Sequence, residues 1–177
     1  RTEEFGKPFF NNAGFSDVVR LNGTELQEYL QESYAGFQPD ETVVVCRSNK
    51  RANIFNREIR NRILYLENEL TAGDYLMVVR NNYFWLPKES EAGFIANGDM
   101  IEVLRIRNVK QLYGFRFADI TFRLIDYPDE KEIDALILLD TLSAESPALP
   151  PAEQQKFMES VLEEHSDISS KDFLQDF

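Results

Sequence analysis

Cysteine, histidine and long apolar runs are almost or wholly missing from this chain of 177 residues. The single cysteine, Cys46, excludes an internal disulfide, and with the single histidine, His165, it leaves too few ligands for a zinc site, which needs about four. No run approaches the roughly 20 apolar residues of a membrane-spanning helix, so we expect no membrane partner. This cysteine usage favours a reducing setting, and the cytoplasm is therefore the expected location.

Catalytic motifs are also missing. The sequence has no Gly-x-x-x-x-Gly-Lys-Ser/Thr phosphate loop, no His-Glu-x-x-His, no Cys-x-x-Cys and no Gly-x-Ser-x-Gly. Carboxylates are abundant, but no two of them pair across a predicted cleft. We therefore expect no catalytic residue, no metal site and no other cofactor within these 177 residues.

Positive charge is scarce on average but concentrated in the middle of the chain. The formal net charge is −12, yet residues 42–123 carry 13 Lys and Arg against 9 Asp and Glu. Residues 129–177 carry 3 basic against 13 acidic residues. The acidic average argues against nucleic acid as a partner. Because a basic central region lies between acidic ends, nucleic acid remains a possible partner of that region.

Residues 1–69 alternate between strand-like and helix-like patterns. Residues 17–21 are a short strand candidate, and residues 24–34 carry an apolar stripe at helical spacing. Residues 42–46, Thr-Val-Val-Val-Cys, have the composition of a strand buried on both faces, and Ser48 or Asn49 can cap a following helix. This alternation predicts parallel strands with helical crossovers, that is, a small α/β part.

The predicted helix over residues 49–66 carries charge of almost one sign. Between Arg47 and Arg62 there are six basic residues and one acid, Glu58. Like charges three and four positions apart repel each other on a helix. A solvated helix face is one interpretation, and a surface that contacts phosphate is the other. The one-sided charge favours the second.

The apolar period changes from 3.6 to 2 near residue 72, which predicts β structure over residues 70–142. Strand candidates at 75–79 and 100–106 are separated by Asn97-Gly98, a dipeptide typical of a type I′ turn. A last apolar strand is expected at 133–142. Several short strands in about 70 residues suggest a small antiparallel barrel.

Aromatic residues alternate over 113–117, and apolar residues alternate again over 120–124, but with the opposite parity. A change of parity within one strand predicts a β-bulge near residues 118–119. After the barrel, residues 143–177 read as a Pro- and Ser-rich linker followed by a C-terminal acidic helix that opens at Pro150-Pro151.

Two segments resemble superfamily 1 helicases of the RecD type, including the exodeoxyribonuclease V alpha chain. Residues 43–60, Val-Val-Val-Cys-Arg-Ser-Asn-Lys-Arg-Ala-Asn-Ile-Phe-Asn-Arg-Glu-Ile-Arg, are similar to the strand and helix around motif IV. Residues 72–83 and 95–103, with Gly-Asp, Arg-Asn-Asn-Tyr and Asn-Gly-Asp in that order, are similar to the insertion that follows. The resemblance covers roughly residues 40–142.

The resemblance implies a fragment of an ATP-dependent DNA helicase with an α+β fold. Residues 1–69 would be a partial RecA-like α/β segment, residues 70–142 an SH3-like β-barrel insertion, and residues 143–177 the linker and acidic helix. The phosphate loop, the Mg-binding motif and the late Arg motifs of these helicases are absent. ATP and Mg would therefore be held by the remainder of the helicase chain, and the fragment alone would not be an enzyme.

The resemblance also assigns roles to individual residues, with single-stranded DNA as the partner. The start of the motif IV helix lies near the nucleotide in related helicases, and here it falls on Arg47, Asn49 and Lys50. Exposed aromatic side chains beside cations suit base stacking and backbone contact on single strands. The residues expected to contact nucleic acid are Arg51, Arg57, Arg60, Arg62, Arg80, Asn82, Tyr83, Trp85, Arg105 and Arg107.

Three alternatives stay open at this point. Arg47 can cap a sheet edge without touching a ligand. Phe84 and Trp85 can fold back to close the barrel. The chain as a whole can be a non-enzymatic β-barrel module whose aromatic groove binds a peptide. Salt dependence separates the last reading from DNA binding, because contacts with phosphate weaken steeply as salt rises.

Overall fold

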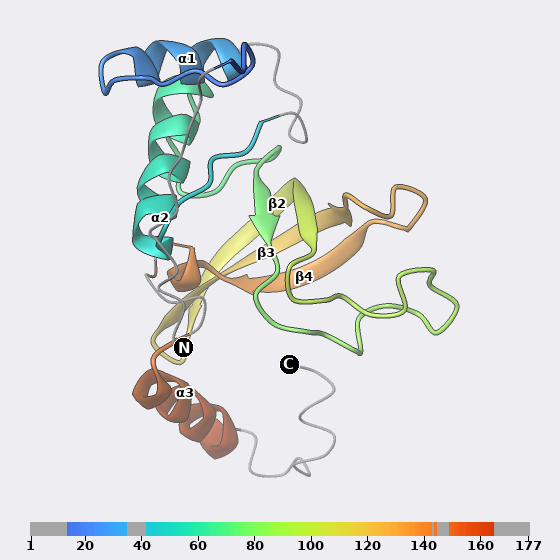
Figure 1. The fold of residues 1–177 in the computed structure, drawn as a ribbon. Coiled ribbons are helices and arrows are strands. Elements are labelled where there is room, and N and C mark those ends of the chain that lie inside the picture. Colours follow the sequence, from blue (N-terminus) through green and yellow to red (C-terminus); the bar gives the residue numbers. More distant parts are fainter. Residues whose placement is uncertain (1–13, 35–41, 143, 145–148, 165–177) are drawn as a thin grey trace, which may run out of the picture.

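The computed structural model describes residues 14–34, 42–142, 144 and 149–164 as a mixed helix and strand chain (Figure 1). Its elements are α1 (Glu25–Tyr34), α2 (Asn49–Glu58), a π-helical turn (Ile59–Ile63), β1 (Tyr75–Met77), β2 (Met100–Leu112), β3 (Phe115–Leu124), β4 (Ile133–Leu138), a 3₁₀ turn (Leu139–Thr141) and α3 (Pro151–Glu164). Helices α1 and α2 lie to one side of the sheet. The predicted α+β class is confirmed.

The four strands form one antiparallel sheet in the order β1–β2–β3–β4, so neighbours in the sheet are also neighbours in sequence. The sheet curls into a half-barrel (Figure 1). Alternating residues of β2 and β3 fill its inner face; Val103 and Ile120, for example, are fully buried. The prediction of antiparallel β structure after residue 70 is confirmed at this level.

The main apolar cluster belongs to the β part, although Ile59 and, in α3, Val161 are also buried. All its buried residues lie between Leu86 and Leu139, and Phe122, Ile120 and Leu124 are the largest fully buried side chains there. Within residues 14–34 and 42–69, by contrast, Ile59 is the only buried side chain. The two helices of the N-terminal part therefore pack loosely beside a well-filled half-barrel.

The tight hairpin turn lies at a different dipeptide from the predicted one. Strands β2 and β3 pair up to a two-residue loop, Tyr113-Gly114, where φ is 54° and 81°. Positive φ at both central residues is typical of a type I′ turn. Asn97-Gly98 does form a turn, but only its glycine has positive φ. The predicted type I′ turn at Asn97-Gly98 is therefore wrong.

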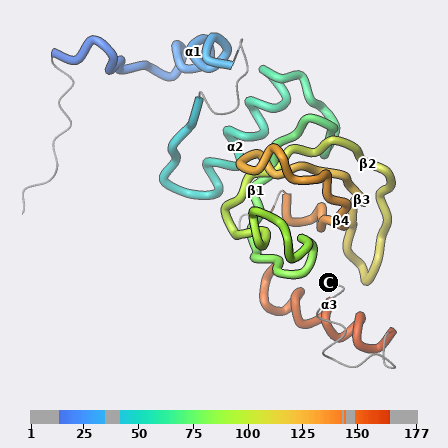
Figure 2. The backbone as a smooth tube through the Cα atoms, turned by 90° about the vertical axis from the view of Figure 1, so that its right-hand side faces the viewer, coloured from blue at the N-terminus to red at the C-terminus, as the bar shows by residue number. Residues whose placement is uncertain are grey.

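The apolar residues of β3 alternate with one parity up to Phe117 and with the other from Ile120, because both faces of the strand are buried. Phe117 faces outward onto Phe157 of α3, with 6.0 Å between ring centroids, whereas Ile120 points into the core. In both views α3 lies beside the β2–β3 turn (Figure 1, Figure 2). The predicted bulge at 118–119 of β3 is therefore wrong. The register shifts lie in β2, between Val103 and Arg105 and between Ile106 and Asn108.

Helix α2 begins where the sequence predicts. Ser48 has an extended backbone, and its Oγ accepts a hydrogen bond from the backbone N–H of Arg51 at 3.4 Å. This cap satisfies one of the free N–H groups at the helix start. The π-helical turn then carries the helix to Ile63, close to the predicted end. Helix α3 begins at Pro151, as predicted.

The two strands predicted in the N-terminal part do not form. Residues 17–21 are irregular, and residues 42–46 are extended but belong to no sheet of the described chain. A strand persists only when its backbone groups pair with a neighbour, and the described segments offer none. The predicted linker after residue 142 and the acidic end beyond residue 164 lie largely or wholly outside the described residues.

Candidate nucleic-acid interface

Helix α2 presents cations to solvent from its first turn. Lys50, Arg51 and Arg57 are exposed, and the helix contains no acid before Glu58. In the described part of the chain, Arg51 and Arg57 have no acidic partner within ion-pair distance. The free N–H groups at a helix start add partial positive charge. Helix α2 therefore exposes positive charge at both ends, with Lys50 and Arg51 in its first turn and Arg57 in its last.

The residues expected near a nucleotide lie together at the start of α2. Arg47, Asn49 and Lys50 follow one another within a single turn, and all three are exposed. The nearby groove of about 170 Å³ lies further along, between α1 and α2, and is lined mainly by apolar side chains such as Leu30 and Phe55. Its lining suits an apolar contact better than a phosphate.

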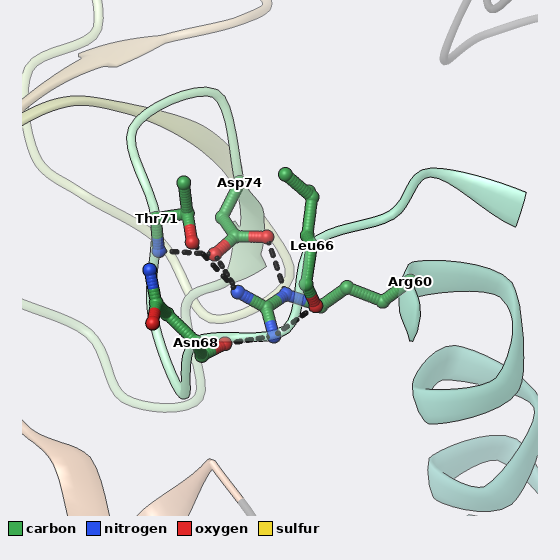
Figure 3. A network of polar contacts seen from close by, with 5 residues as sticks. All are labelled: Arg60, Leu66, Asn68, Thr71 and Asp74. Atoms are coloured by element: carbon green, nitrogen blue, oxygen red, sulfur yellow. Dashed lines mark hydrogen bonds and ion pairs between the residues drawn. The ribbon is translucent and has the colours of Figure 1, made fainter. Parts of the chain in front are cut away.

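Arg60 is committed to the fold (Figure 3). Its Nε and one terminal nitrogen donate to the two carboxylate oxygens of Asp74 at 2.7 and 2.8 Å. The terminal nitrogen that binds Asp74, Nη2, also donates to Thr71 Oγ1 at 3.2 Å. The other terminal nitrogen, Nη1, donates to the carbonyl oxygens of Leu66 and Asn68. All five N–H donors are engaged.

The Arg60–Asp74 contact is a structural clasp, not a free cationic site. The side chains are only 21% and 7% exposed. It joins the start of the π-helical turn to the residue just before β1. Arg62, two positions later, is exposed and pairs with Glu58 at 2.7 Å. Of the four cations that we expected on this helix to bind nucleic acid, Arg51 and Arg57 remain available.

Each arginine expected on the barrel strands has an acidic partner. Arg105 pairs with Glu132, and Arg107 pairs with Asp134 and donates to Thr121 Oγ1 at 3.0 Å. The Thr121 hydroxyl in turn donates to Asp134 at 2.7 Å, and these two contacts hold the pKa of Asp134 below its usual range. The barrel arginines therefore offer little net charge to a phosphate.

Two further arginines of the sheet follow the same rule. Arg116 binds Glu69 with both terminal nitrogens, at 2.7 and 2.8 Å, and Asp140 at 2.9 Å. Arg123 binds Glu102 at 2.6–2.7 Å. These three acids come from three different segments, so alternating charge covers the outside of the half-barrel.

The loop between β1 and β2 carries exposed aromatic rings. Tyr83 is 59% exposed and stacks on Phe94, with ring centroids 4.9 Å apart and planes 29° apart. Phe84 is 54% exposed, and Arg80 is exposed without an acidic partner among the described residues. Two of these rings, Phe84 and Phe94, are missing from the residues that the sequence predicts to bind.

The loop is held by Asn82. Its side-chain oxygen accepts hydrogen bonds from the N–H groups of Phe84 and Trp85 at 3.0 and 2.9 Å. Its backbone pairs with Ile95 in both directions, which places the next residue, Tyr83, opposite Phe94. The sequence around Phe94 contains no signal for a binding role, and only its pairing with the Asn82 segment reveals it. Asn82 therefore positions the rings through its backbone and its side-chain oxygen.

Trp85 is neither fully exposed nor fully buried. It is partly buried and packs against the core, so it does close the half-barrel, as one open alternative supposed. Phe84 does not fold back. The ring best placed to stack on a base is therefore Tyr83.

The structure does not bring the expected contact residues together on one face. Figure 1 draws α2 and the aromatic loop on opposite sides of the sheet. They are two separate candidate surfaces. We call them the α2 surface (Arg47, Lys50, Arg51, Arg57) and the ring surface (Arg80, Tyr83, Phe84, Phe94).

Glu130 fixes the far end of the aromatic loop. Its Oε1 accepts hydrogen bonds from Ser90 Oγ at 2.5 Å and from the N–H groups of Glu91 and Ala92 at 2.7 and 3.4 Å. The Ser90 hydroxyl and these N–H groups lower the pKa of Glu130 below its ordinary value of 4.5. A carboxylate with a lowered pKa stabilises the fold above that value, and the contribution is lost as the pH falls through the lowered pKa.

We expect acid to release this loop. In an NMR titration from pH 6 to pH 2.5, the amide signals of Glu91 and Ala92 should shift together with the Glu130 carboxyl signal, at a midpoint below 4.5. In Glu130→Gln the same amide signals should show no such transition. Asp129→Asn, at the exposed neighbouring position, should keep it. A midpoint above 4.5 would contradict the assignment.

The described residues form no additional class of site, neither a membrane-spanning helix nor a metal centre. Among the described residues no helix is long and apolar enough to cross a membrane, and no three His, Cys, Asp or Glu side chains gather where they could hold a metal ion. Comparison of the chain with protein-family models, with curated proteins and with solved structures gives no match. The geometry of the two surfaces is therefore what any functional argument must use.

Proposed function

We propose that this chain is a single-stranded DNA-binding part of a RecD-like superfamily 1 helicase. The observation that carries the proposal is the α2 surface. Arg51 and Arg57 stay exposed and without acidic partners in the described chain, although every strand arginine considered above is paired. Both side chains can neutralise phosphate oxygens of a nucleic-acid backbone.

In this proposal the chain positions DNA and does not hydrolyse ATP. The remainder of the helicase chain would supply the phosphate loop and the Mg ligands, and Arg47, Asn49 and Lys50 would face the nucleotide from this side. The half-barrel would be the SH3-like insertion, and α1 and α2 would belong to the RecA-like part. The place of action would be the cytoplasm.

Binding of a fluorescent oligothymidine, measured by anisotropy at several salt concentrations, tests the proposal. For single strands the slope of log K against log salt is about 0.7 per phosphate contact. Arg51→Glu with Arg57→Glu should therefore reduce the slope by about 1.4 and weaken binding at low salt. Tyr83→Ala should weaken binding by about 1–3 kcal/mol while leaving the slope unchanged.

The matched control reverses two paired arginines on the sheet. Arg105→Glu with Arg123→Glu changes the net charge by the same amount, but these residues already face Glu132 and Glu102. It should alter the slope much less than the α2 variant. Equal slopes for the two variants would show that only net charge matters. Absence of binding by the wild-type chain at low salt would refute DNA binding by this chain.

The second candidate is a protein-interaction module of the half-barrel. The pairing of the strand arginines favours it, because a nearly neutral sheet with exposed rings suits a peptide better than a phosphate backbone. Tyr83, Phe84 and Phe94 would then form the peptide contact. In that case Tyr83→Ala would abolish peptide binding that is insensitive to salt, and the α2 variant would leave it unchanged.

A further inference from the structure

Residues 42–46 form an extended segment that no other part of the described chain covers. Val43 and Val45 are 83% and 89% exposed, the highest values among the large apolar residues of the described chain. No backbone hydrogen bond joins residues 43–46 to another described segment. The run Thr-Val-Val-Val-Cys is nevertheless composed as a strand with both faces buried.

The segment is held extended from both ends. The Thr42 hydroxyl donates a hydrogen bond to the carbonyl of Ser33 in α1 at 3.3 Å. At the other end Ser48 caps α2. Figure 1 draws the segment as a plain trace that runs alongside α2 toward the start of that helix. An extended backbone that is fixed at its ends loses less conformational entropy when a second strand pairs with it.

None of the usual devices that protect an exposed strand edge occurs in the segment. Natural edges are blunted by Lys, by Pro, by bulges or by inward-pointing charges. Residues 42–46 contain no charge and no proline, and three of the five residues are valine. Such an edge is an aggregation hazard unless another strand covers it.

We propose that residues 42–46 are a docking strand that binds a β-strand of a partner polypeptide. Backbone groups that pair with no described segment require a partner with its own peptide groups, which another polypeptide strand supplies in register. The exposed Val43 and Val45 require apolar, β-branched side chains opposite them. Arg47, exposed directly after the strand and without an acid in the described chain, requires a carboxylate at the matching end of the partner.

The partner is therefore a short uncharged β-branched strand bordered by Asp or Glu. This inference does not rest on the DNA-binding proposal, which depends on Arg51, Arg57 and Tyr83. The two can fail separately at Val43 and Val45, which belong neither to the α2 surface nor to the ring surface. Arg47 is shared with the α2 surface, so the valine variants and not the Arg47 variant distinguish the two proposals.

A designed peptide tests the docking strand on the full 177-residue chain. The probe is acetyl-Glu-Thr-Val-Thr-Val-Thr-Glu-amide, titrated into labelled protein and followed by amide NMR. We expect saturable shifts at residues 43–46 and slower hydrogen exchange of their N–H groups. Val43→Glu with Val45→Glu should abolish these shifts, and the fold should persist because both side chains are exposed.

Two matched peptides separate strand pairing from other contacts. The same sequence N-methylated at its central residues keeps the side chains but lacks the N–H donors, and it should not bind. A lysine-flanked peptide should bind wild type about fivefold more weakly than the glutamate-flanked one, and Arg47→Glu should reverse that preference.

Three results would overturn the proposal. The first is an absence of shifts at residues 43–46 with the glutamate-flanked peptide. The second is equal binding of the N-methylated peptide, which would mean a contact through side chains alone. The third is a concentration-dependent dimer without any peptide, seen by sedimentation and lost in the double Val→Glu variant, which would make a second copy of this chain the occupant.

Discussion

Arg60→Ala should lower the free energy of unfolding by about 3–5 kcal/mol, because it leaves the nearly buried carboxylate of Asp74 without its counter-charge. Asp74 is 7% exposed, and both its oxygens bind the guanidinium. The variant also leaves the carbonyls of Leu66 and Asn68 without their donor. Urea denaturation followed by the fluorescence of Trp85, the only tryptophan, measures the change.

Arg62→Ala is the matched control for this prediction. It removes the same side chain two positions later, where the partner Glu58 is 50% exposed and the pair is surrounded by water. Exposed pairs of this spacing contribute about 0.3–0.5 kcal/mol, so the control should remain close to wild type. Arg60→Lys should stay destabilised, because an ammonium group cannot reproduce the two-pronged contact with Asp74.

A double variant separates the free energy of the Arg60–Asp74 pair from the cost of leaving one charge unpaired. Arg60→Met with Asp74→Asn removes both charges, while the Asn oxygen can still accept the Thr71 N–H that Asp74 accepts at 2.6 Å. It should cost less than Arg60→Ala alone, since no charge is left unpaired. If Arg60→Ala is no more destabilising than Arg62→Ala, the clasp does not tie α2 to the sheet.

The sequence predicts the β part well because its signals are local. Alternation in 100–106 and 120–124 follows from one buried face, and that face is the core of the half-barrel. The predictions fail where a distant element decides the outcome. The outer ring of Phe117 is covered by Phe157 of α3, about 40 residues away, so the change of parity reflects a second buried face and not a bulge.

The turns show a similar limit. Propensity favours Asn97-Gly98 for a type I′ turn, yet the chain places Tyr113 in the left-handed region, where a bulky residue is strained. The Tyr113 ring packs edge-on against Phe157 at 5.7 Å between centroids, and this contact offsets the strain. Turn statistics contain no information about such a contact.

The candidate site is harder to predict than the fold because charge pairing is non-local. Nothing in the neighbourhood of Arg107 indicates that Asp134 will neutralise it, and Arg116 meets Glu69 from a segment 47 residues earlier. The one-signed run on α2 is different, since its cations lie within one helix whose single acid, Glu58, pairs with Arg62. A local pattern therefore predicts the α2 surface but overestimates the basic character of the strands.

Phe157→Ala should release α3 from the sheet. The Phe157 ring meets Tyr113, Phe115 and Phe117 at centroid distances of 5.7, 5.5 and 6.0 Å. Full truncation of a buried phenylalanine costs about 3–5 kcal/mol, and for this partly exposed ring we expect about 2–3 kcal/mol. Because α3 lies at one edge of the fold, the loss should appear as local opening of the helix, with the sheet intact.

Hydrogen exchange of the α3 amides measures this opening. Protection over 151–164 should fall by a factor of about 30–150, which corresponds to 2–3 kcal/mol, while Val103 and Ile120 in the core keep theirs. Met158→Ala is the control on the neighbouring residue, which is 41% exposed, and it should change protection by less than about threefold. If both variants open α3 equally, helix propensity and not the aromatic cluster holds it. If Phe157→Ala also lowers the protection of the core strands, α3 and the sheet unfold as one cooperative unit. In that case the Phe157 ring stabilises the half-barrel through the outer face of β3.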